Sequence, residues 1–391
     1  MSPQTNLVLL GSTGSIGVQT LDVVARLCKV GRPFRVVALA AGRNSRLLAE
    51  QIESARPEVV SLADERAAED VRRRFPGLRV LAGEDGLVAL ASLDEVDVVV
   101  NAVVGAAGLP ATLAALARGR TLALANKESL VTGGDLVRDA LGAGGGRILP
   151  IDSEHSALLQ CLDAGRRADV DRLVLTASGG PFLDLGRADR ATATARDALR
   201  HPTWSMGKRI TIDSATLVNK AFEVIEAHYL FDVPYERIDA VIHPASILHS
   251  LVQFRDGSLI AQAAAHDMRI PIQYALTYPE RVSTGLPQLD LARVGRLEFR
   301  PVDREAFPAF GTVLAAAHAG GTATAAVNAA DEVLVARFLE GEIPFGGLDR
   351  GLEATLAAWA RERADGDVPA TLDSIRSTDH WARAFASGLT L

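Results

Sequence analysis

Two segments of the sequence gather carboxylates of the kind that bind divalent cations. Asp152 and Glu154 stand two positions apart, which places both side chains on one face of an extended segment. Glu223 and Glu226 stand three positions apart and share one face of a helix. Oxygen ligands alone favour Mg²⁺ or Mn²⁺ over zinc. The alternatives are a solvated loop for Asp152 and Glu154, and a helix-surface salt bridge for Glu226.

A second group of polar residues has the composition of a phosphate pocket. Hydroxyl and amide groups donate hydrogen bonds to phosphate oxygens, and a lysine adds positive charge. A pair of glycines, Gly179 and Gly180, lets the backbone approach a ligand closely. Each serine taken alone is more often a turn or cap residue, but together the residues favour anion binding. The group consists of Ser178, Ser214, Asn219 and Lys220.

A glycine-rich loop from Gly11 to Gly17 follows an apolar run near the N-terminus. A loop between a first strand and a first helix brings backbone N–H groups to the pyrophosphate of a nucleotide. The hydroxyls of Ser12, Thr13 and Ser15 are additional donors. The loop, the carboxylates and the phosphate-type pocket together indicate a metal-assisted redox enzyme.

The second apolar strand discriminates between nicotinamide cofactors. In NAD enzymes an acidic residue usually follows this strand and binds the ribose hydroxyls. Here the strand is followed by Gly42, Arg43 and Asn44, and Arg43 can pair with a 2′-phosphate. The sequence therefore favours NADP, with an exposed loop arginine as the alternative.

The segment from His201 to Lys208 looks exposed from its sequence, yet it contains one of the chain's three tryptophans. A lid that closes an apolar surface over a substrate needs such residues. The alternative is a loop that Trp204 anchors into the core. His243, His249 and His266 are further candidates, although a lone histidine is more often structural.

The elements that position these residues begin with alternating strands and helices. Continuous apolar strands separated by helices predict a mainly parallel sheet covered on both faces. Further strands are expected in the middle of the chain, together with a helix over 217–231, and the alanine- and leucine-rich C-terminal part is expected to be helical. Strands are expected over 6–10, 34–40, 59–62, 80–81, 96–101, 121–125, 172–176, 240–243, 251–254 and 258–263. The expected organisation is a nucleotide-binding domain over 1–150, a metal and substrate domain over 151–277, a linker over 278–310 and a helical domain over 311–391.

Composition narrows the class of protein. The chain has 391 residues, 48% of them hydrophobic, and a formal net charge of -7, which argues against nucleic-acid binding. Its two cysteines and the lack of a recognisable secretory signal fit a reducing cytoplasm. The uncharged stretch 98–117 is punctuated by glycine and proline, so a buried strand, turn and helix are expected there rather than a membrane span.

Seven motifs match a known family in sequence and in order along essentially the whole chain. They are GSTGSIG, LANKESLV, PIDSEHSA, SGGPF, HPTWSMGKRITIDSATLVNKAFEVIEA, IHPASILHS and DMRIPI. The chain thus resembles the 1-deoxy-D-xylulose 5-phosphate reductoisomerases. The resemblance implies NADPH- and Mg²⁺- or Mn²⁺-dependent rearrangement and reduction of 1-deoxy-D-xylulose 5-phosphate to 2-C-methyl-D-erythritol 4-phosphate, the first committed step of non-mevalonate isoprenoid synthesis. It also implies a homodimer and an α/β fold: a Rossmann-like NADPH domain, an α+β catalytic domain with a mobile flap, and a helical C-terminal domain.

The resemblance also implies roles for individual residues. The metal ligands would be Asp152, Glu154 and Glu223, which with Lys127 and His201 form the catalytic set. Substrate contacts would come from Ser153, Ser178, His201, Trp204, Met206, Ser214, Asn219 and Lys220, as well as from Glu154 and Glu223. Cofactor contacts would come from Ser12, Thr13, Gly14, Ser15, Ile16, Gly42, Arg43, Asn44, Asn126, Lys127, Glu128 and Gly207.

Two rival functions make different demands on the chain. A semialdehyde dehydrogenase needs a catalytic cysteine, and neither Cys28 nor Cys161 has an obvious activating base nearby in the sequence. A non-catalytic NADP-binding sensor would keep the glycine loop without needing the carboxylates and the lysine-bearing pocket together. Metal-dependent turnover would separate an enzyme from such a sensor.

Overall fold

The computed structural model describes residues 3–201, 203–204, 206–362 and 369–391, so that Pro202 and Ser205 of the expected flap lie outside the described residues. The described chain forms two compact units. The first unit comprises Met1–Ser129, Asp135–Ser156 and Asp267–Pro287. The second unit comprises Leu130–Gly134, Ala157–His266 and Gln288–Leu391.

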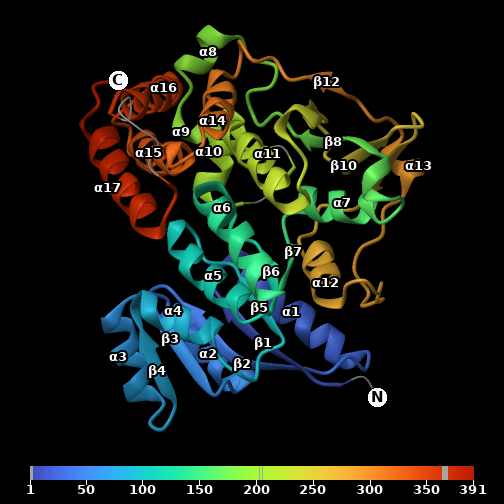
Figure 1. Ribbon diagram of the computed structural model, residues 1–391, viewed down its shortest axis with the longest axis vertical. Coiled ribbons are helices and arrows are strands. Elements are labelled where there is room, and N and C mark those ends of the chain that lie inside the picture. The colour runs from blue at the N-terminus through green and yellow to red at the C-terminus, as the bar shows by residue number, and fades with distance from the viewer. Residues whose placement is uncertain (1–2, 202, 205, 363–368) are drawn as a thin grey trace. The chain divides into compact units, whose positions relative to one another are not determined.

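The first unit is built on a seven-stranded parallel sheet with the strand order β4-β3-β2-β1-β5-β6-β7 (Figure 1). Its central strands are apolar and buried, because helices cover both faces of a parallel sheet. This confirms the Rossmann-like α/β architecture expected from the sequence. The strands are β1 (Thr5–Leu10), β2 (Phe34–Ala41), β3 (Val59–Leu62), β4 (Arg79–Ala82), β5 (Val98–Asn101), β6 (Thr121–Leu124) and β7 (Arg147–Pro150).

Helices connect the strands of this sheet. The alternation of strand and helix gives every crossover the length that parallel pairing needs. Within α6 the backbone of Gly133 is not helical, which marks a kink. The connecting helices are α1 (Ser15–Lys29), α2 (Ser45–Ala55), α3 (Glu65–Arg74), α4 (Gly83–Ala91), α5 (Leu109–Ala117) and α6 (Lys127–Gly144). Helix α7 (Ser153–Leu162) follows β7, and only its residues up to Ser156 belong to the first unit. Helix α12 (Arg269–Thr277) comes from later in the chain.

Helix α12 joins the first unit although more than a hundred residues separate it from α7. The guanidinium of Arg269 donates to Asp22 of α1 at 2.9 Å and also binds Asp267. The Arg269 hydrogen bonds hold the pKa of the Asp267 carboxyl below its usual range. This network of ion pairs explains why α12, a short helix late in the sequence, packs in the unit of the N-terminal sheet.

The second unit has a mixed five-stranded sheet with the order β11-β10-β8-β9-β12. Strands β8 and β9 pair in parallel, whereas β10 pairs antiparallel with both β8 and β11. All the expected middle strands are present: β8 and β10 are longer than expected, β9 begins and ends earlier, and β11 begins one residue later. They are β8 (Val170–Ala177), β9 (Ile238–Ile242), β10 (Leu248–Phe254), β11 (Leu259–Ala263) and β12 (Arg300–Pro301).

The helix expected over 217–231 is one of two consecutive helices, α10 (Lys208–Thr216) and α11 (Val218–Phe231). They meet at Leu217, whose φ of 61° lies in the left-handed region and ends the first helix. The sequence analysis did not predict α10, because its threonines and serine lower helix propensity. Two shorter helices, α8 (Arg187–Ala191) and α9 (Ala195–Ala198), precede it.

The C-terminal part is helical, as expected from its alanine and leucine content. Phenylalanines such as Phe310, Phe338 and Phe345 pack with apolar residues of α10 and α11 in one core. Between the sheet and this helical part, the segment expected to be a linker contains the short helix α13 (Leu291–Val294) and strand β12. The helices are α14 (Pro308–Ala319), α15 (Ala323–Leu339), α16 (Phe345–Glu362) and α17 (Leu372–Gly388).

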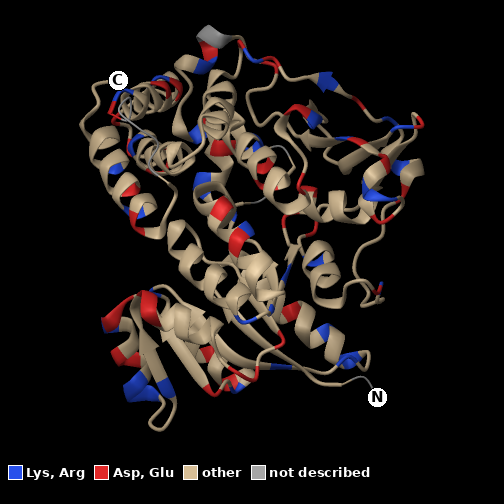
Figure 2. Cartoon of the chain, in the orientation of Figure 1, with Lys and Arg blue, Asp and Glu red and all other residues tan. Residues whose placement is uncertain are grey.

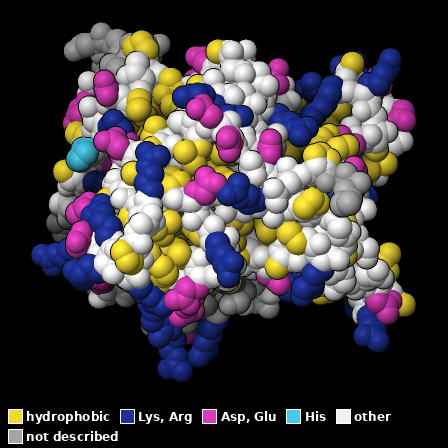
Figure 3. All heavy atoms as spheres, turned by 90° about the horizontal axis from the view of Figure 1, so that it is seen from below, with side chains coloured by type: hydrophobic (Ala, Val, Ile, Leu, Met, Phe, Trp, Pro, Cys, Tyr) yellow, Lys and Arg dark blue, Asp and Glu magenta, His cyan; other side chains and the backbone are white. Residues whose placement is uncertain are grey.

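Charges of both signs are interspersed on the surface. Helix α3 carries basic and acidic positions side by side (Figure 2). Arg72 and Arg73 pair with acids on the same helix, so they lie on a solvated helix face. Figure 3 shows the same mixture of positive, negative and apolar side chains on the face that it draws. Among the described helices, none combines the length and hydrophobicity that crossing a bilayer requires.

Candidate active site

The glycine loop lies at the point where the strand order of the first sheet reverses. Strands β2 and β5 flank β1 on opposite sides, and the loop leaves the carboxyl end of β1. Open parallel sheets bind nucleotides in the crevice at such a switch point. The amides of Gly11 and Ser12 donate to Ala40 O at 2.9 and 2.7 Å, which ties the loop to the end of β2.

Two glycines of the loop are required by close backbone packing. Gly11 has a φ of +84°, and an added Cβ would lie 2.3 Å from Ala102 O. A Cβ on Gly17 would lie 2.3 Å from Gly11 O. Helix α1 therefore starts directly against the loop, with the geometry that brings helix N–H groups to a phosphate.

The start of α1 suits an anion electrostatically. Among the residues that the structure describes, its first turn holds no acidic side chain and its N-cap, Gly14, supplies no side-chain acceptor. The partial positive charge of a helix N-terminus is then directed at whatever lies before it. Gly14 and Ser15 are exposed there, whereas Thr13 and Ile16 are half-buried.

Ser12 differs from the other predicted hydroxyl donors. It is fully buried, and its hydroxyl has no hydrogen-bond partner among the described residues. Its carbonyl accepts a 2.8 Å bond from the side chain of Gln51 on α2. Ser12 thus contributes to the loop through its backbone. The sequence analysis missed Gln51, whose signal is a polar residue on the apolar face that Leu48 and Ile52 define.

The residues after β2 are exposed beside the same crevice. The Arg43 side chain is 89% exposed and lies 3.8 Å from Asp64. Asn44 caps α2, since its side-chain oxygen accepts a 3.1 Å bond from the amide of Leu47. Gly42 precedes them and is also exposed. A solvent-accessible guanidinium at this strand end is available to a ligand phosphate.

Asn126 and Glu128 hold two loops of the first sheet together. The Asn126 amide donates to the carbonyls of Val103 and Gly105 at 2.8 and 3.0 Å, and its oxygen caps α6. Glu128 accepts from the amide of Gly105 at 3.1 Å. These bonds shape the crevice walls at the ends of β5 and β6.

A buried polar network supports these two loops from behind. The Asn101 amide donates to Thr112 Oγ1 at 2.9 Å, and the Thr112 hydroxyl lies 3.0 Å from Ser129 Oγ. Ser129 in turn bonds Asn126. From the sequence, Asn101 was placed only at the end of the strand expected over 96–101. A polar residue at the carboxyl end of a buried strand was the available signal.

Asp152 lies at the N-terminus of α7 rather than in an extended segment. Its carboxylate accepts the amide of Glu154 at 3.1 Å, the bond of a helix N-cap. The prediction that an extended backbone places Asp152 and Glu154 on one face is wrong, because α7 begins at Ser153. Helical geometry brings the two acids together instead, with Lys127 Nζ paired to Asp152.

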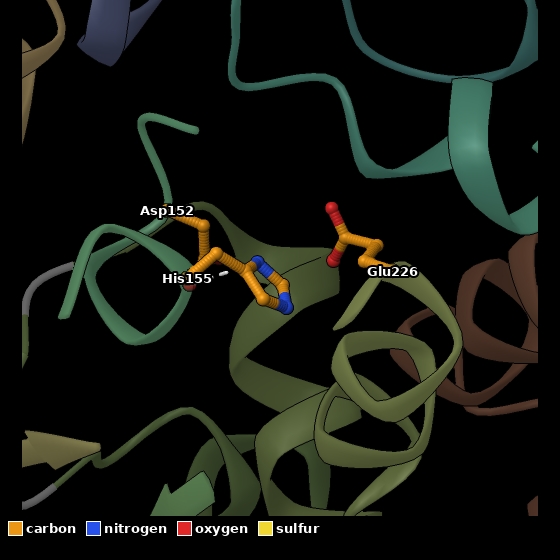
Figure 4. A group of neighbouring side chains, drawn as sticks. All are labelled: Asp152, His155 and Glu226. Carbon is orange, nitrogen blue, oxygen red and sulfur yellow. Dashed lines mark ion pairs between the residues drawn. The ribbon is translucent and has the colours of Figure 1, made fainter. Parts of the chain in front are cut away.

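The neighbours of Asp152 on α7 are also polar. Ser153 donates to the Glu154 carboxylate at 2.5 Å. The ring of His155 is fully buried, with Nδ1 3.8 Å from Asp152 Oδ1 (Figure 4). The first unit thus collects Lys127, Asp152, Ser153 and Glu154 around the junction of β7 and α7.

Helix α11 carries the remaining predicted carboxylate of the metal set. Glu223 is 1% exposed, accepts a 2.5 Å bond from Asn219, and pairs with Lys220. Glu226, labelled in Figure 4 on the same helix, is buried as well. The alternative of a surface salt bridge at Glu226 is therefore wrong. Helix α11 is largely apolar and packed within its unit, so Glu223 and Glu226 do not lie on an exposed face.

Ser178, His201 and Ser214 converge in the second unit. His201 Nε2 lies 3.0 Å from Ser178 Oγ and 3.1 Å from Ser214 Oγ. The two hydroxyls are 3.5 Å apart. Gly180 supports the group by donating its amide to Ser178 Oγ at 3.1 Å. Three side chains able to donate hydrogen bonds therefore meet at one point.

The backbone fixes which nitrogen of His201 carries the proton. Nδ1 accepts the amides of Thr203 and Trp204 at 3.2 and 3.0 Å. Nδ1 is therefore unprotonated, and Nε2–H donates toward the serine hydroxyls. Burial, and secondarily the charge of His266, lower the pKa of His201 below its ordinary value. A neutral imidazole that acts as a donor is the result.

The described residues of the expected flap are partly buried. Trp204 makes ring contacts with His266 and His249, at centroid distances of 5.2 and 6.1 Å. Met206 is half-buried, and Gly207 is the exposed N-cap of α10. His249 and His266 thus support Trp204, while His243 stacks on Phe299 elsewhere in the unit.

Comparisons with known proteins assign the family. Family models of 1-deoxy-D-xylulose 5-phosphate reductoisomerase match residues 7–134, and two models of its C-terminal domains match 148–231 and 264–385. The chain belongs to the 1-deoxy-D-xylulose 5-phosphate reductoisomerase family. A reductoisomerase of Exiguobacterium sibiricum is 48% identical over 98% of this chain and 98% of its own. A reductoisomerase of Thermomicrobium roseum is 49% identical over 97% of this chain and 96% of its own.

Solved reductoisomerases share the fold. The enzyme of Zymomonas mobilis in complex with NADPH has a TM-score of 0.90 at 38% identity and covers 98% of each chain. A reductoisomerase in complex with NADPH, fosmidomycin and magnesium has a TM-score of 0.90 at 38% identity, over 98% of this chain and 97% of its own. The α/β fold with a helical C-terminal part is therefore that of the reductoisomerase family.

The cysteines argue against the dehydrogenase rival. Burial raises the pKa of the Cys161 thiol to about 11, which leaves it protonated and unreactive at neutral pH. Cys28 is exposed, and its sulfur lies 3.4 Å from the amide of Phe34 on the surface side of β2. Cys161 is therefore not the activated thiol that a semialdehyde dehydrogenase requires.

The reductoisomerase carboxylates fit a hard divalent cation chemically. Asp152 and Glu154 in the first unit and Glu223 in the second each offer a carboxylate oxygen. Lysines accompany two of them, Lys127 on Asp152 and Lys220 on Glu223, so the charge of each of these two acids is partly balanced within its own unit. Oxygen donors of this type select Mg²⁺ or Mn²⁺.

Proposed function

We propose that this chain converts 1-deoxy-D-xylulose 5-phosphate to 2-C-methyl-D-erythritol 4-phosphate, with NADPH as reductant and Mg²⁺ or Mn²⁺ as the metal. The observation that carries the proposal is the donor cluster of Ser178, His201 and Ser214. A Rossmann-like sheet occurs in many dehydrogenases, but a neutral imidazole beside two hydroxyls is suited to a phosphate ester. Family membership then specifies which phosphate ester.

In this proposal, the phosphate of the substrate binds to Ser178, His201, Ser214, Asn219 and Lys220. The imidazole and hydroxyls donate hydrogen bonds, and Lys220 contributes the charge. The phosphate does not react, so its binding energy orients the reacting end of the substrate.

The reacting end of the substrate binds to the carboxylate set. Asp152, Glu154 and Glu223 would hold the metal, which supplies Lewis-acid polarisation of the hydroxyketone oxygens. Lys127 and Ser153 lie beside two of these acids, within hydrogen-bond reach of a substrate hydroxyl that approaches them.

NADPH occupies the crevice of the first sheet in this proposal. Its pyrophosphate binds at the start of α1, and its 2′-phosphate pairs with Arg43. NADPH supplies the hydride that reduces the rearranged aldehyde. The cofactor contacts are assigned to Ser12, Thr13, Gly14, Ser15, Ile16, Gly42, Arg43, Asn44, Asn126, Lys127, Glu128 and Gly207.

The segment over 200–208, termed the flap, covers the substrate. His201 reaches the phosphate while Trp204 and Met206 shield the reacting atoms from water. Water exclusion protects the aldehyde until hydride arrives. The turn that His201 Nδ1 makes with the amides of Thr203 and Trp204 couples phosphate binding to the position of the tryptophan.

The assignment of domains follows the same scheme. Residues 1–150 form the NADPH domain, 151–277 the catalytic domain, 278–310 a linker and 311–391 the helical domain. We propose a homodimer in the cytoplasm, supported by the family and by the low cysteine content. Light scattering on the purified protein measures the oligomeric state directly.

The test of the proposed function is NADPH oxidation with 1-deoxy-D-xylulose 5-phosphate, with and without divalent metal. Glu223→Gln removes one carboxylate charge, and turnover should fall by at least the roughly 10–100-fold that loss of a supporting partner costs a metal site. NADPH binding, followed by fluorescence, should be unchanged. Glu236→Gln, at an exposed residue of the same unit, is the control. Metal-independent turnover, or full activity in Glu223→Gln, would contradict the metal assignment.

A further inference from the structure

Arg209, the second residue of α10, is bound by three side chains of α15. Its guanidinium donates to Asn328 Oδ1 at 2.9 Å, to Asp331 Oδ2 at 3.1 and 3.2 Å, and to Glu332 Oε1 at 3.0 Å. Asp213 on α10 itself lies 3.7 Å away. The acceptors occupy successive turns of one helix face, so the guanidinium fork is bound from several directions.

Arg209 follows directly after the flap in the chain, so its contacts with α15 bear on the flap. The flap ends at Lys208, so Arg209 fixes the point at which the flap joins a packed helix. Ser214 lies on α10 about one turn further on, where its hydroxyl bonds His201. The orientation of α10 therefore sets both the end of the flap and one donor of the phosphate cluster.

We propose that Arg209 is a positioning residue for substrate binding, a role that rests on the proposed function. By docking α10 on α15, it holds Ser214 in register with Ser178 and His201 and fixes the C-terminal base of the flap. Arg209 touches neither the phosphate nor the reacting atoms. Its effect reaches the substrate through the backbone of α10.

The same network offers a matched control. Arg383 on α17 donates to the second oxygen of Glu332 at 2.6 Å and to Asp379 at 2.7 Å. It therefore shares Glu332 with Arg209, but it contacts α15 from α17 rather than from α10. Loss of Arg383 removes comparable ion pairs from the second unit without releasing α10.

The variants to compare are Arg209→Met, Arg209→Lys and Arg383→Met in the full chain. Displacement of a binding group by about 1 Å costs on the order of a hundredfold. We therefore expect Arg209→Met to raise the KM for 1-deoxy-D-xylulose 5-phosphate about ten- to a hundredfold, with a smaller change in kcat and an unchanged KM for NADPH. Arg209→Lys, which keeps the charge but not the fork, should be intermediate. Arg383→Met should leave the KM for the sugar phosphate unchanged.

A second readout does not depend on the reaction. Chymotrypsin cleavage after Trp204 follows local opening of the flap, and should be several-fold faster in Arg209→Met than in wild type or Arg383→Met. If the wild type shows no turnover, the proposed function fails while this measurement still decides the role of Arg209. Equal cleavage rates in the Arg209 and Arg383 variants, or an unchanged KM in both, would overturn the proposal. Should Arg209→Met fail to fold, an unchanged KM and cleavage rate in Arg209→Lys would do the same.

Discussion

Arg43 is the residue through which cofactor preference can be tested most directly. Its side chain is 89% exposed after β2, so a 2′-phosphate can reach it without rearrangement. Arg43→Ala removes a charged hydrogen bond of about 1.5–3 kcal/mol, which corresponds to roughly ten- to hundredfold in NADPH affinity. Kinetics with NADPH and NADH should therefore show a reduced preference for NADPH.

The control for Arg43 lies three residues further on. Arg46 is also 89% exposed and lies 3.8 Å from Glu50 along α2. Arg46→Ala removes the same charge from the same region and should leave the NADPH/NADH ratio unchanged. If both variants shift the ratio equally, general surface charge is responsible and the specific role of Arg43 is refuted.

His201 predicts a pH dependence of stability. Its pKa in the folded protein is lowered, by burial first, so the unfolded chain binds the proton more readily than the native one. The stabilising contribution is complete above the ordinary histidine pKa of about 6.5 and decreases as the pH falls through the folded pKa. Protonation also places a hydrogen on Nδ1, against the amides of Thr203 and Trp204.

Denaturant unfolding as a function of pH measures this contribution. Wild type should lose stability below about pH 6.5 by more than His201→Gln does. His380→Gln, at an exposed histidine of α17, should follow the wild type. Superimposable profiles for wild type and His201→Gln would refute a lowered pKa at this residue.

At the level of elements, the proposed flap can be tested through its tryptophan. Trp204 lies in ring contact with His266 and is half-buried. Closure over a sugar phosphate or over fosmidomycin should change its surroundings and hence its fluorescence. The change should disappear in Trp204→Phe and persist in Trp381→Phe, whose indole bonds Glu362 within the helical part. An emission change that survives Trp204→Phe would favour a core anchor over a lid.

Elements with a strong apolar period could be predicted from the sequence, whereas those that carry the site were harder. The buried strands of the first sheet can be recognised from their continuous apolar runs. Helix α7 was read as extended, because its first turn is composed of polar residues that also suit a loop. Helix α10 was missed because its threonines and serine have low helix propensity. In both cases the functional polar residues obscure the helical period.

At the level of the whole molecule, the motifs identified the candidate site residues but not the residues that hold them in place. Asp152, Glu223 and Ser214 could be selected by residue type and by resemblance to a family. Gln51 and Arg209 could not, because each acts by binding a backbone or an acid that is distant in sequence. Such partners are set by tertiary packing. Their positions become evident only when the helices are placed within each unit.

The pair of charges buried on α11 implies a conflict between stability and activity. Lys220 and Glu223 are 3% and 1% exposed. Replacement of a buried ion pair by apolar residues of similar size is often neutral or stabilising by about 1–4 kcal/mol, whereas removal of one partner costs about 3–5 kcal/mol. The double variant Lys220→Met/Glu223→Leu should therefore unfold at a higher denaturant concentration than Glu223→Leu, and at least as high as wild type, while lacking turnover. A double variant no more stable than Glu223→Leu would contradict this. Folding alone requires neither charge on this helix, which supports the roles proposed for Lys220 and Glu223 in substrate and metal binding.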